Sequence, residues 1–107
     1  MSVDYTAEVK RYDRDCDQKA IDAIKKHLGI ALKSKDASLV SCSSKSELER
    51  IRDSWLKKKL GMTDDDKTLD GAIKAVCDTM KDDKRKQRVT FYYLLAKNSG
   101  KLGTLAN

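Results

Sequence analysis

Arg88 to Ala96 reads RVTFYYLLA, and this stretch decides the fold. It holds Phe91, Tyr92 and Tyr93, half of the chain's six aromatic residues. No other segment is apolar at so many consecutive positions, so we expect it to be buried around most of its circumference. Its β-branched and aromatic residues also suit a strand, but no second strand-like run exists to pair with it. The sequence therefore predicts a central helix over residues 84–98.

Apolar residues at steps of three and four predict four further helices. These helices lie near residues 4–13, 17–28, 45–60 and 66–80, with a short turn near 36–40. Asp17 and Ser44 are placed to cap two of the helix starts, and Gly29 is placed to end a helix. The predicted fold class is all-α: a compact single-domain bundle of about five helices around the central C-terminal helix at residues 84–98. Residues 99–107 are expected to form a mobile tail.

The composition is consistent with one helical domain. A chain of 107 residues is close to the common domain size. It can bury roughly two thirds of its unfolded surface, which is enough for a core without metals or disulfides. The sequence contains no proline, a residue that mostly marks turns and helix ends. This absence favours long helices over a fold of strands and turns.

The three cysteines, Cys16, Cys42 and Cys77, form no CxxC pair, and the lone histidine, His27, completes no recognised zinc spacing. We therefore predict no metal or cofactor and a reduced, cytoplasmic protein. The first fifteen residues are charged throughout, unlike a secretory signal. No apolar run approaches the roughly 20 residues of a membrane-spanning helix, so no membrane contact is expected.

The net charge of +6 is distributed unevenly along the chain. Residues 1–28 are neutral and residues 29–62 carry +4, whereas residues 63–83 carry −4 and residues 84–107 carry +6. Such a separation can attract an anionic partner, or it can pair one helix with its neighbour. The charge pattern leaves both interpretations open.

Several runs of sequence together resemble a known family. They are KHLGIAL at 26–32, KDASLVSCS at 35–43, LKKKLG at 56–61, DGAIKAVC at 70–77 and RVTFYYLLA at 88–96. In this order and spacing, they resemble an uncharacterised bacterial family of small helical proteins, catalogued as a domain of unknown function. The resemblance implies a compact all-helical fold in a bacterial cytoplasm. It implies no activity, cofactor or catalytic residue.

The most suggestive candidate site is the basic cluster Lys84, Arg85, Lys86 and Arg88. It falls at the predicted start of the central helix, where the helix dipole favours anions rather than cations. A bound phosphate or nucleic acid would offset that cost, using the side chains and the free backbone N–H groups. The acidic stretch at 63–70 could instead supply the counter-charge within the chain. No aromatic residue alternates with these cations, so base stacking is not indicated.

Cys42 is a candidate reactive thiol, because it lies in a serine-rich loop just before a predicted helix. That setting lowers the pKa of a thiol and can produce a nucleophile or a redox sensor. A cysteine nucleophile needs a base, and His27 is the only histidine available. The simpler alternative is a small buried residue beside Val40. His27 itself is expected to flank the core and to be stabilised as a cation at a helix end.

Two weaker patterns have ordinary structural explanations. Asp66 to Gly71 resembles the start of a calcium loop, but position 12, which should be a bidentate glutamate, is Cys77. Trp55, Tyr92 and Tyr93 could line a ligand pocket, although aromatic residues at helical spacing more often form a core. Neither pattern assigns a function.

For function, the sequence supports a non-enzymatic cytoplasmic interaction module that contacts an anionic partner through Lys84, Arg85, Lys86 and Arg88. Two alternatives remain open. One is a structural protein that forms a homodimer, and the other is a thiol enzyme or redox sensor at Cys42. The partner and any substrate are not specified by these residues.

Overall fold

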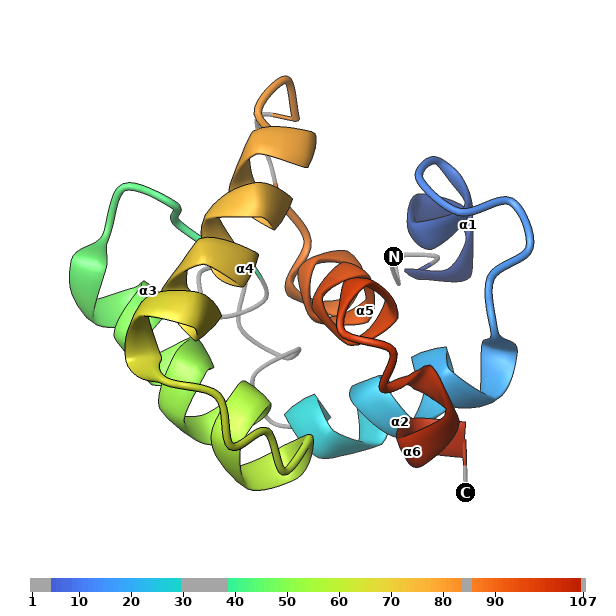
Figure 1. Cartoon of the computed structure of the whole chain (residues 1–107). Coiled ribbons are helices and arrows are strands. Elements are labelled where there is room, and N and C mark those ends of the chain that lie inside the picture. Colours follow the sequence, from blue (N-terminus) through green and yellow to red (C-terminus); the bar gives the residue numbers. More distant parts are fainter. Residues whose placement is uncertain (1–4, 30–38, 84–85, 107) are drawn as a thin grey trace.

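The computed structural model describes residues 5–29, 39–83 and 86–106. Within them the chain forms helices and no named strand, as Figure 1 shows. The helices are α1 (Tyr5–Lys10), α2 (Gln18–Leu28), α3 (Lys45–Arg50), the π-helix η2 (Ile51–Lys59), α4 (Asp66–Thr79), α5 (Arg88–Asn98) and α6 (Leu102–Ala106). The prediction of an all-α fold is confirmed. The predicted turn near 36–40 lies partly outside the described residues.

Helix α5 is the centre of the fold. Every residue from Arg88 to Ala96 is buried, including Phe91 and Tyr93, whose side chains are fully shielded from solvent. Helices α1, α2, α4 and α6 and the π-helix all contact it, and Figure 1 shows α5 lying between α1 on one side and α4 on the other. The predicted central helix is therefore present, and it is buried around its circumference rather than along one stripe.

The start of α5 differs from the predicted helix start at residue 84. The helix begins at Arg88, and Gln87 before it has extended backbone angles. Gln87 forms an isolated antiparallel bridge with Leu39, and the N–H of Val40 donates to the carbonyl oxygen of Lys86 at 2.8 Å. These backbone hydrogen bonds compete with a further helical turn, because each amide can satisfy only one geometry. Lys86 therefore precedes the helix, and Lys84 and Arg85 lie outside the described residues.

The predicted helix at 45–60 is continuous but changes type at its middle. Arg50 and Ile51 both have right-handed helical angles, and from Ile51 onwards the chain is π-helical. The N–H of Leu60 donates to the carbonyl oxygen of Trp55, five residues back, at 2.9 Å. The buried positions Ile51, Trp55, Leu56 and Leu60 explain this choice.

At 3.6 residues per turn, the nine steps from Ile51 to Leu60 span about two and a half turns, so an α-helix would place these two side chains on opposite faces. A π-helix, with about 4.4 residues per turn, returns them to one face. The wider turn of the π-helix therefore allows all four apolar side chains to be buried in one core.

The C-terminal segment contains a helix in place of the predicted mobile tail. Gly100 adopts a left-handed conformation (φ 70°), and the N–H of Lys101 donates to the carbonyl oxygen of Ala96 at 2.8 Å. This glycine turn ends α5 and directs the chain back along the bundle. Helix α6 then packs on α2 and α5, with Leu105 buried. The buried leucine explains why the segment is held in place.

The connection between α1 and α2 is tied to α5 by Tyr93. The Tyr93 hydroxyl donates to Oδ2 of Asp13 at 2.7 Å and accepts from the N–H of Asp17 at 2.9 Å. Asp17 caps α2, as predicted, by accepting from the N–H groups of Lys19 and Ala20. Lys97 adds an ion pair with Asp13 at 3.4 Å. One tyrosine hydroxyl therefore connects the N-terminal helices to the central helix.

Candidate functional site

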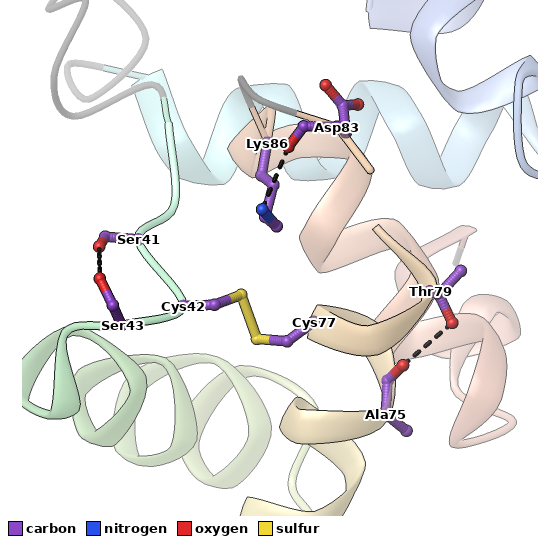
Figure 2. The surroundings of a disulfide bond; sticks show 8 residues. All are labelled: Ser41, Cys42, Ser43, Ala75, Cys77, Thr79, Asp83 and Lys86. Atoms are coloured by element: carbon purple, nitrogen blue, oxygen red, sulfur yellow. Dashed lines mark hydrogen bonds between the residues drawn. A yellow bond between two sulfur atoms is a disulfide. The ribbon is translucent and has the colours of Figure 1, made fainter. Parts of the chain in front are cut away.

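A disulfide bond joins Cys42, in the loop before α3, to Cys77 on α4. The two Cα atoms are 6.0 Å apart, which is within the range that a disulfide spans. Figure 2 shows the bond bridging the loop and the helix, beside the turn formed by Ser41 and Ser43. The sequence-based interpretation of Cys42 as a free thiol therefore differs from the structure. Cys16 is the free cysteine.

The disulfide lies in a groove of about 650 Å³ between α3 and α4. Leu48 and Ile73 give the groove an apolar lining next to the two cysteines. Its charged lining consists of four lysines, Lys45, Lys74, Lys81 and Lys86, and three carboxylates, Glu49, Asp70 and Asp78. The structure thus places apolar surface, a disulfide and separated charges in one concave site.

The charge of this groove is net positive. Asp70 is engaged by the guanidinium of Arg52 at 3.2 Å, which leaves two carboxylates facing four ammonium groups. Lys86 donates to the carbonyl oxygen of Asp83 at 3.1 Å, as Figure 2 shows. Lys45, Lys74 and Lys81 are exposed and form no ion pair within 4.0 Å among the described residues. The groove therefore offers cations that an external carboxylate could pair with.

Arg88 is not part of an exposed basic cluster, contrary to the prediction. Its side chain is buried and forms an ion pair with Glu47. It also donates to the Tyr92 hydroxyl at 3.2 Å and to the carbonyl oxygen of Leu39 at 3.1 Å. A buried guanidinium needs such a set of partners to offset its desolvation. Of the four predicted cations, the structure places Lys86 at the groove and Arg88 in the interior.

The aromatic residues considered for a ligand pocket belong to the core. Trp55 and Tyr93 are fully buried, and Tyr92 is nearly so. The Trp55 Nε1–H donates to the carbonyl oxygen of Tyr92 at 3.3 Å, and the two rings are 4.7 Å apart. Burial raises the pKa of Tyr92, and the adjacent Arg88 partly opposes that rise. These side chains pack with one another in the interior, as expected for aromatic residues that form a core rather than a ligand pocket.

His27 lies against the Trp55 ring, with the two ring centroids 5.1 Å apart. Burial lowers its pKa, and the positive charge of Lys59 lowers it further. The imidazole is therefore held towards its neutral form, which is the opposite of the cation predicted for this helix end. His27 is also not among the described residues that line the groove around Cys42.

The charges around the π-helix form a separate network with α4. Arg52 pairs with Asp53 at 3.1 Å and with Asp70 at 3.2 Å, while Lys57 pairs with Asp66 at 2.5 Å. The hydrogen bond from Arg52 is the largest cause of the lowered pKa of Asp53. Asp66 and Asp70, considered above for a calcium loop, are thus engaged by cations from η2 and lie within the regular helix α4. Lys57 also pairs with Asp53, at 3.6 Å.

Comparison with known proteins agrees with the resemblance noted from the sequence. The family DUF2853, described as a protein of unknown function, matches residues 4–103. The chain belongs to this family. No curated protein matches the sequence. Among the described residues no helix combines the length and the apolar character needed to cross a membrane.

Sequence reasoning missed most of the groove. Lys45, Lys74 and Lys81 are single cations in three different sequence contexts, and none belongs to a conspicuous basic run. The available signal was the step of three residues from Lys74 to Cys77, which makes the two neighbours on one helix, whereas Lys81 follows in the turn after α4. Pairing that face with the loop at Cys42 required the tertiary fold.

Proposed function

We propose that this protein is a non-enzymatic interaction module that binds an acidic segment of a partner protein in the groove between α3 and α4. The observation that carries the proposal is the set of four lysines around an apolar lining. We also propose a cytoplasmic location, which suits a chain that retains a free cysteine, Cys16.

Charge complementarity selects the class of partner. Exposed ammonium groups around a concave site attract carboxylates, and they raise the association rate more than the final affinity. Glu49 and Asp78 on the same lining disfavour a uniformly charged polyanion, since like charges brought together cost free energy. A partner segment whose carboxylates are separated by uncharged residues can pair with the lysines and keep its negative charges away from Glu49 and Asp78.

The apolar lining favours a peptide over a nucleic acid. Leu48, which is partly exposed at the groove, can be covered by an apolar side chain of a partner, and burial of apolar surface provides the main free energy of most protein associations. Binding of single-stranded nucleic acid relies on aromatic side chains that stack with bases, and no aromatic residue lines this groove among the described residues. The expected ligand is therefore an acidic peptide that also carries leucine-like side chains.

The proposal is tested by fluorescence anisotropy with labelled peptides of about 15 residues that alternate carboxylates with leucines. We expect binding that weakens as salt rises from low to physiological concentration, because exposed charges are screened over a Debye length of about 8–10 Å. A poly-aspartate peptide, which lacks apolar side chains, is expected to bind more weakly. Short DNA and RNA duplexes are measured in parallel.

The matched variants are Lys74→Gln and Lys81→Gln in the groove and Lys67→Gln as the control. Lys67 is exposed on α4, the helix that carries Lys74, and is not part of the groove lining. Each groove variant should weaken peptide binding about threefold to tenfold, and the control should change it less than about twofold. Equal effects of all three variants, or tighter binding of nucleic acid than of every peptide, would overturn the proposal.

A further inference from the structure

The Cys42–Cys77 disulfide is open to a reductant. Both cysteines are half-buried and line the groove. Reduction of a disulfide starts with attack by a thiolate on sulfur, so access decides whether it proceeds in the folded protein. Lys74 on α4 and Lys81 in the turn after it line the groove together with Cys77. Nearby cations stabilise a thiolate, and therefore also the sulfur that leaves when the bond breaks.

The core around the disulfide has other supports. Leu69, Ile73, Val76 and Met80 anchor α4, and each is essentially fully buried. On the other side, the N–H of Val40 is bonded to the carbonyl oxygen of Lys86. Breaking the bond would therefore leave α4 and residue 40 in place. It would release the turn at residues 41–44, whose Cys42 and Ser43 form one wall of the groove.

We propose that the Cys42–Cys77 disulfide is a reversible redox latch that fixes the wall of the groove formed by residues 41–44. Its opening loosens that wall and, resting on the proposed function, weakens binding of the acidic segment. A wall held in its binding geometry loses less conformational entropy when the ligand binds. In a cytoplasmic setting a disulfide is usually transient and regulatory, which is the role assigned here.

The reductant is a dithiol. One of its thiolates attacks the sulfur of one cysteine, the Sγ–Sγ bond breaks, and the other cysteine leaves as a thiolate that takes a proton. The second thiol of the reductant then displaces the bound cysteine and closes the reductant's own disulfide. In sum, two electrons and two protons pass from the dithiol to Cys42 and Cys77. Oxidation by a disulfide reverses the same steps.

The first test uses the folded, full-length protein in graded mixtures of reduced and oxidised dithiothreitol, with thiols trapped by a maleimide and located by mass spectrometry. Cys16→Ser removes the third thiol. We expect Cys42 and Cys77 to be trapped together and reversibly. Amide hydrogen exchange should accelerate about tenfold or more in residues 41–44 through local opening, whereas α5 should continue to exchange only through global unfolding.

Three results would overturn the latch. They are reduction only after global unfolding, no change in exchange at residues 41–44, and local opening of α5 as well, which would mean that the bond holds the core rather than the turn alone. The double variant Cys42→Ser/Cys77→Ser provides a permanently open form, and its exchange pattern should match that of the reduced protein.

The second test compares peptide affinity of the oxidised and open forms by the anisotropy assay described above. We expect the open form to bind the leucine-containing acidic peptide about tenfold more weakly, and equal affinity would overturn the link between latch and binding. If the oxidised protein binds no peptide, the proposed function fails. The trapping and exchange measurements decide on the latch independently of that result.

Discussion

Replacing Tyr93 by phenylalanine tests how the N-terminal helices are held to α5. The substitution removes one hydroxyl and keeps the buried ring. Two hydrogen bonds are lost, one to the carboxylate of Asp13 at 2.7 Å and one from the N–H of Asp17 at 2.9 Å. A hydrogen bond to a charged group contributes about 1.5–3 kcal/mol, and a neutral one about 0.5–1.5 kcal/mol. Because water can reach part of this site, we expect a loss of about 2–3 kcal/mol.

The assay is guanidinium chloride and thermal unfolding followed by circular dichroism at pH 7. For a domain of this size, the expected loss corresponds to a fall in Tm of roughly 10–20 °C. Tyr12→Phe is the matched control, since the half-buried Tyr12 hydroxyl donates to Asp83 at 3.2 Å. It should cost less than about 1 kcal/mol. A loss below about 0.5 kcal/mol for Tyr93→Phe would refute the reasoning.

The pH dependence gives an independent check. The hydrogen bond from Tyr93 is the main cause that lowers the pKa of Asp13, followed by Lys97, with burial opposing both. A carboxyl group whose pKa is lower in the folded state contributes stability above its unfolded pKa, and that contribution is lost as the pH falls through the folded value. The difference between wild type and Tyr93→Phe should therefore shrink below about pH 4. A difference that stays constant down to pH 2 would contradict this.

The alkaline side has the opposite sign. Burial raises the pKa of Tyr93 to about 12, so its hydroxyl stays protonated and able to donate at neutral pH. A group with a raised folded pKa loses its contribution as the pH rises from the unfolded towards the folded value. The contribution of Tyr93 should fade between about pH 10 and pH 12. The variant should lack that part of the alkaline transition.

Three further substitutions are measured by the same unfolding assay. Cys42→Ser/Cys77→Ser removes the disulfide, which closes a loop with a sequence separation of 35. The free energy of unfolding should fall by about 4 kcal/mol, because the unfolded chain gains loop entropy. Cys16→Ser is the control, and an equal loss of stability in both variants would contradict the estimate. Leu105→Ala should cost about 2 kcal/mol if α6 is a packed element, and no loss would mean that its buried side chain contributes nothing. Trp55→Phe removes a buried hydrogen bond and part of a ring, at about 2 kcal/mol, and a neutral result would contradict the packing described here.

The central helix could be predicted because its signal is local. Nine consecutive residues from Arg88 to Ala96 are almost all apolar, and burial on all sides follows directly. The prediction was wrong for the first residue of this run, because Arg88 was assigned to an exposed basic cluster and is buried. The sequence cannot show that Glu47, forty-one positions earlier, supplies its buried counter-charge. The ion pair depends on the tertiary fold.

The π-helix could not be predicted from a pattern with 3.6 residues per turn. The spacing of Ile51, Trp55, Leu56 and Leu60 carries a longer period, which an α-helical template divides between two faces. The disulfide was missed for a different reason. Cys42 and Cys77 share no local motif, and cysteine pairing requires a Cα separation that only the folded chain defines.

The position of Trp55 has a practical consequence. It is the only tryptophan in the chain, and its indole lies in the dry interior against both His27 and Tyr92. Transfer of this ring into water on unfolding should shift its emission to longer wavelength. The protein thus contains an intrinsic optical reporter at the junction of α2, the π-helix and α5, and no chemical labelling is needed to follow that junction.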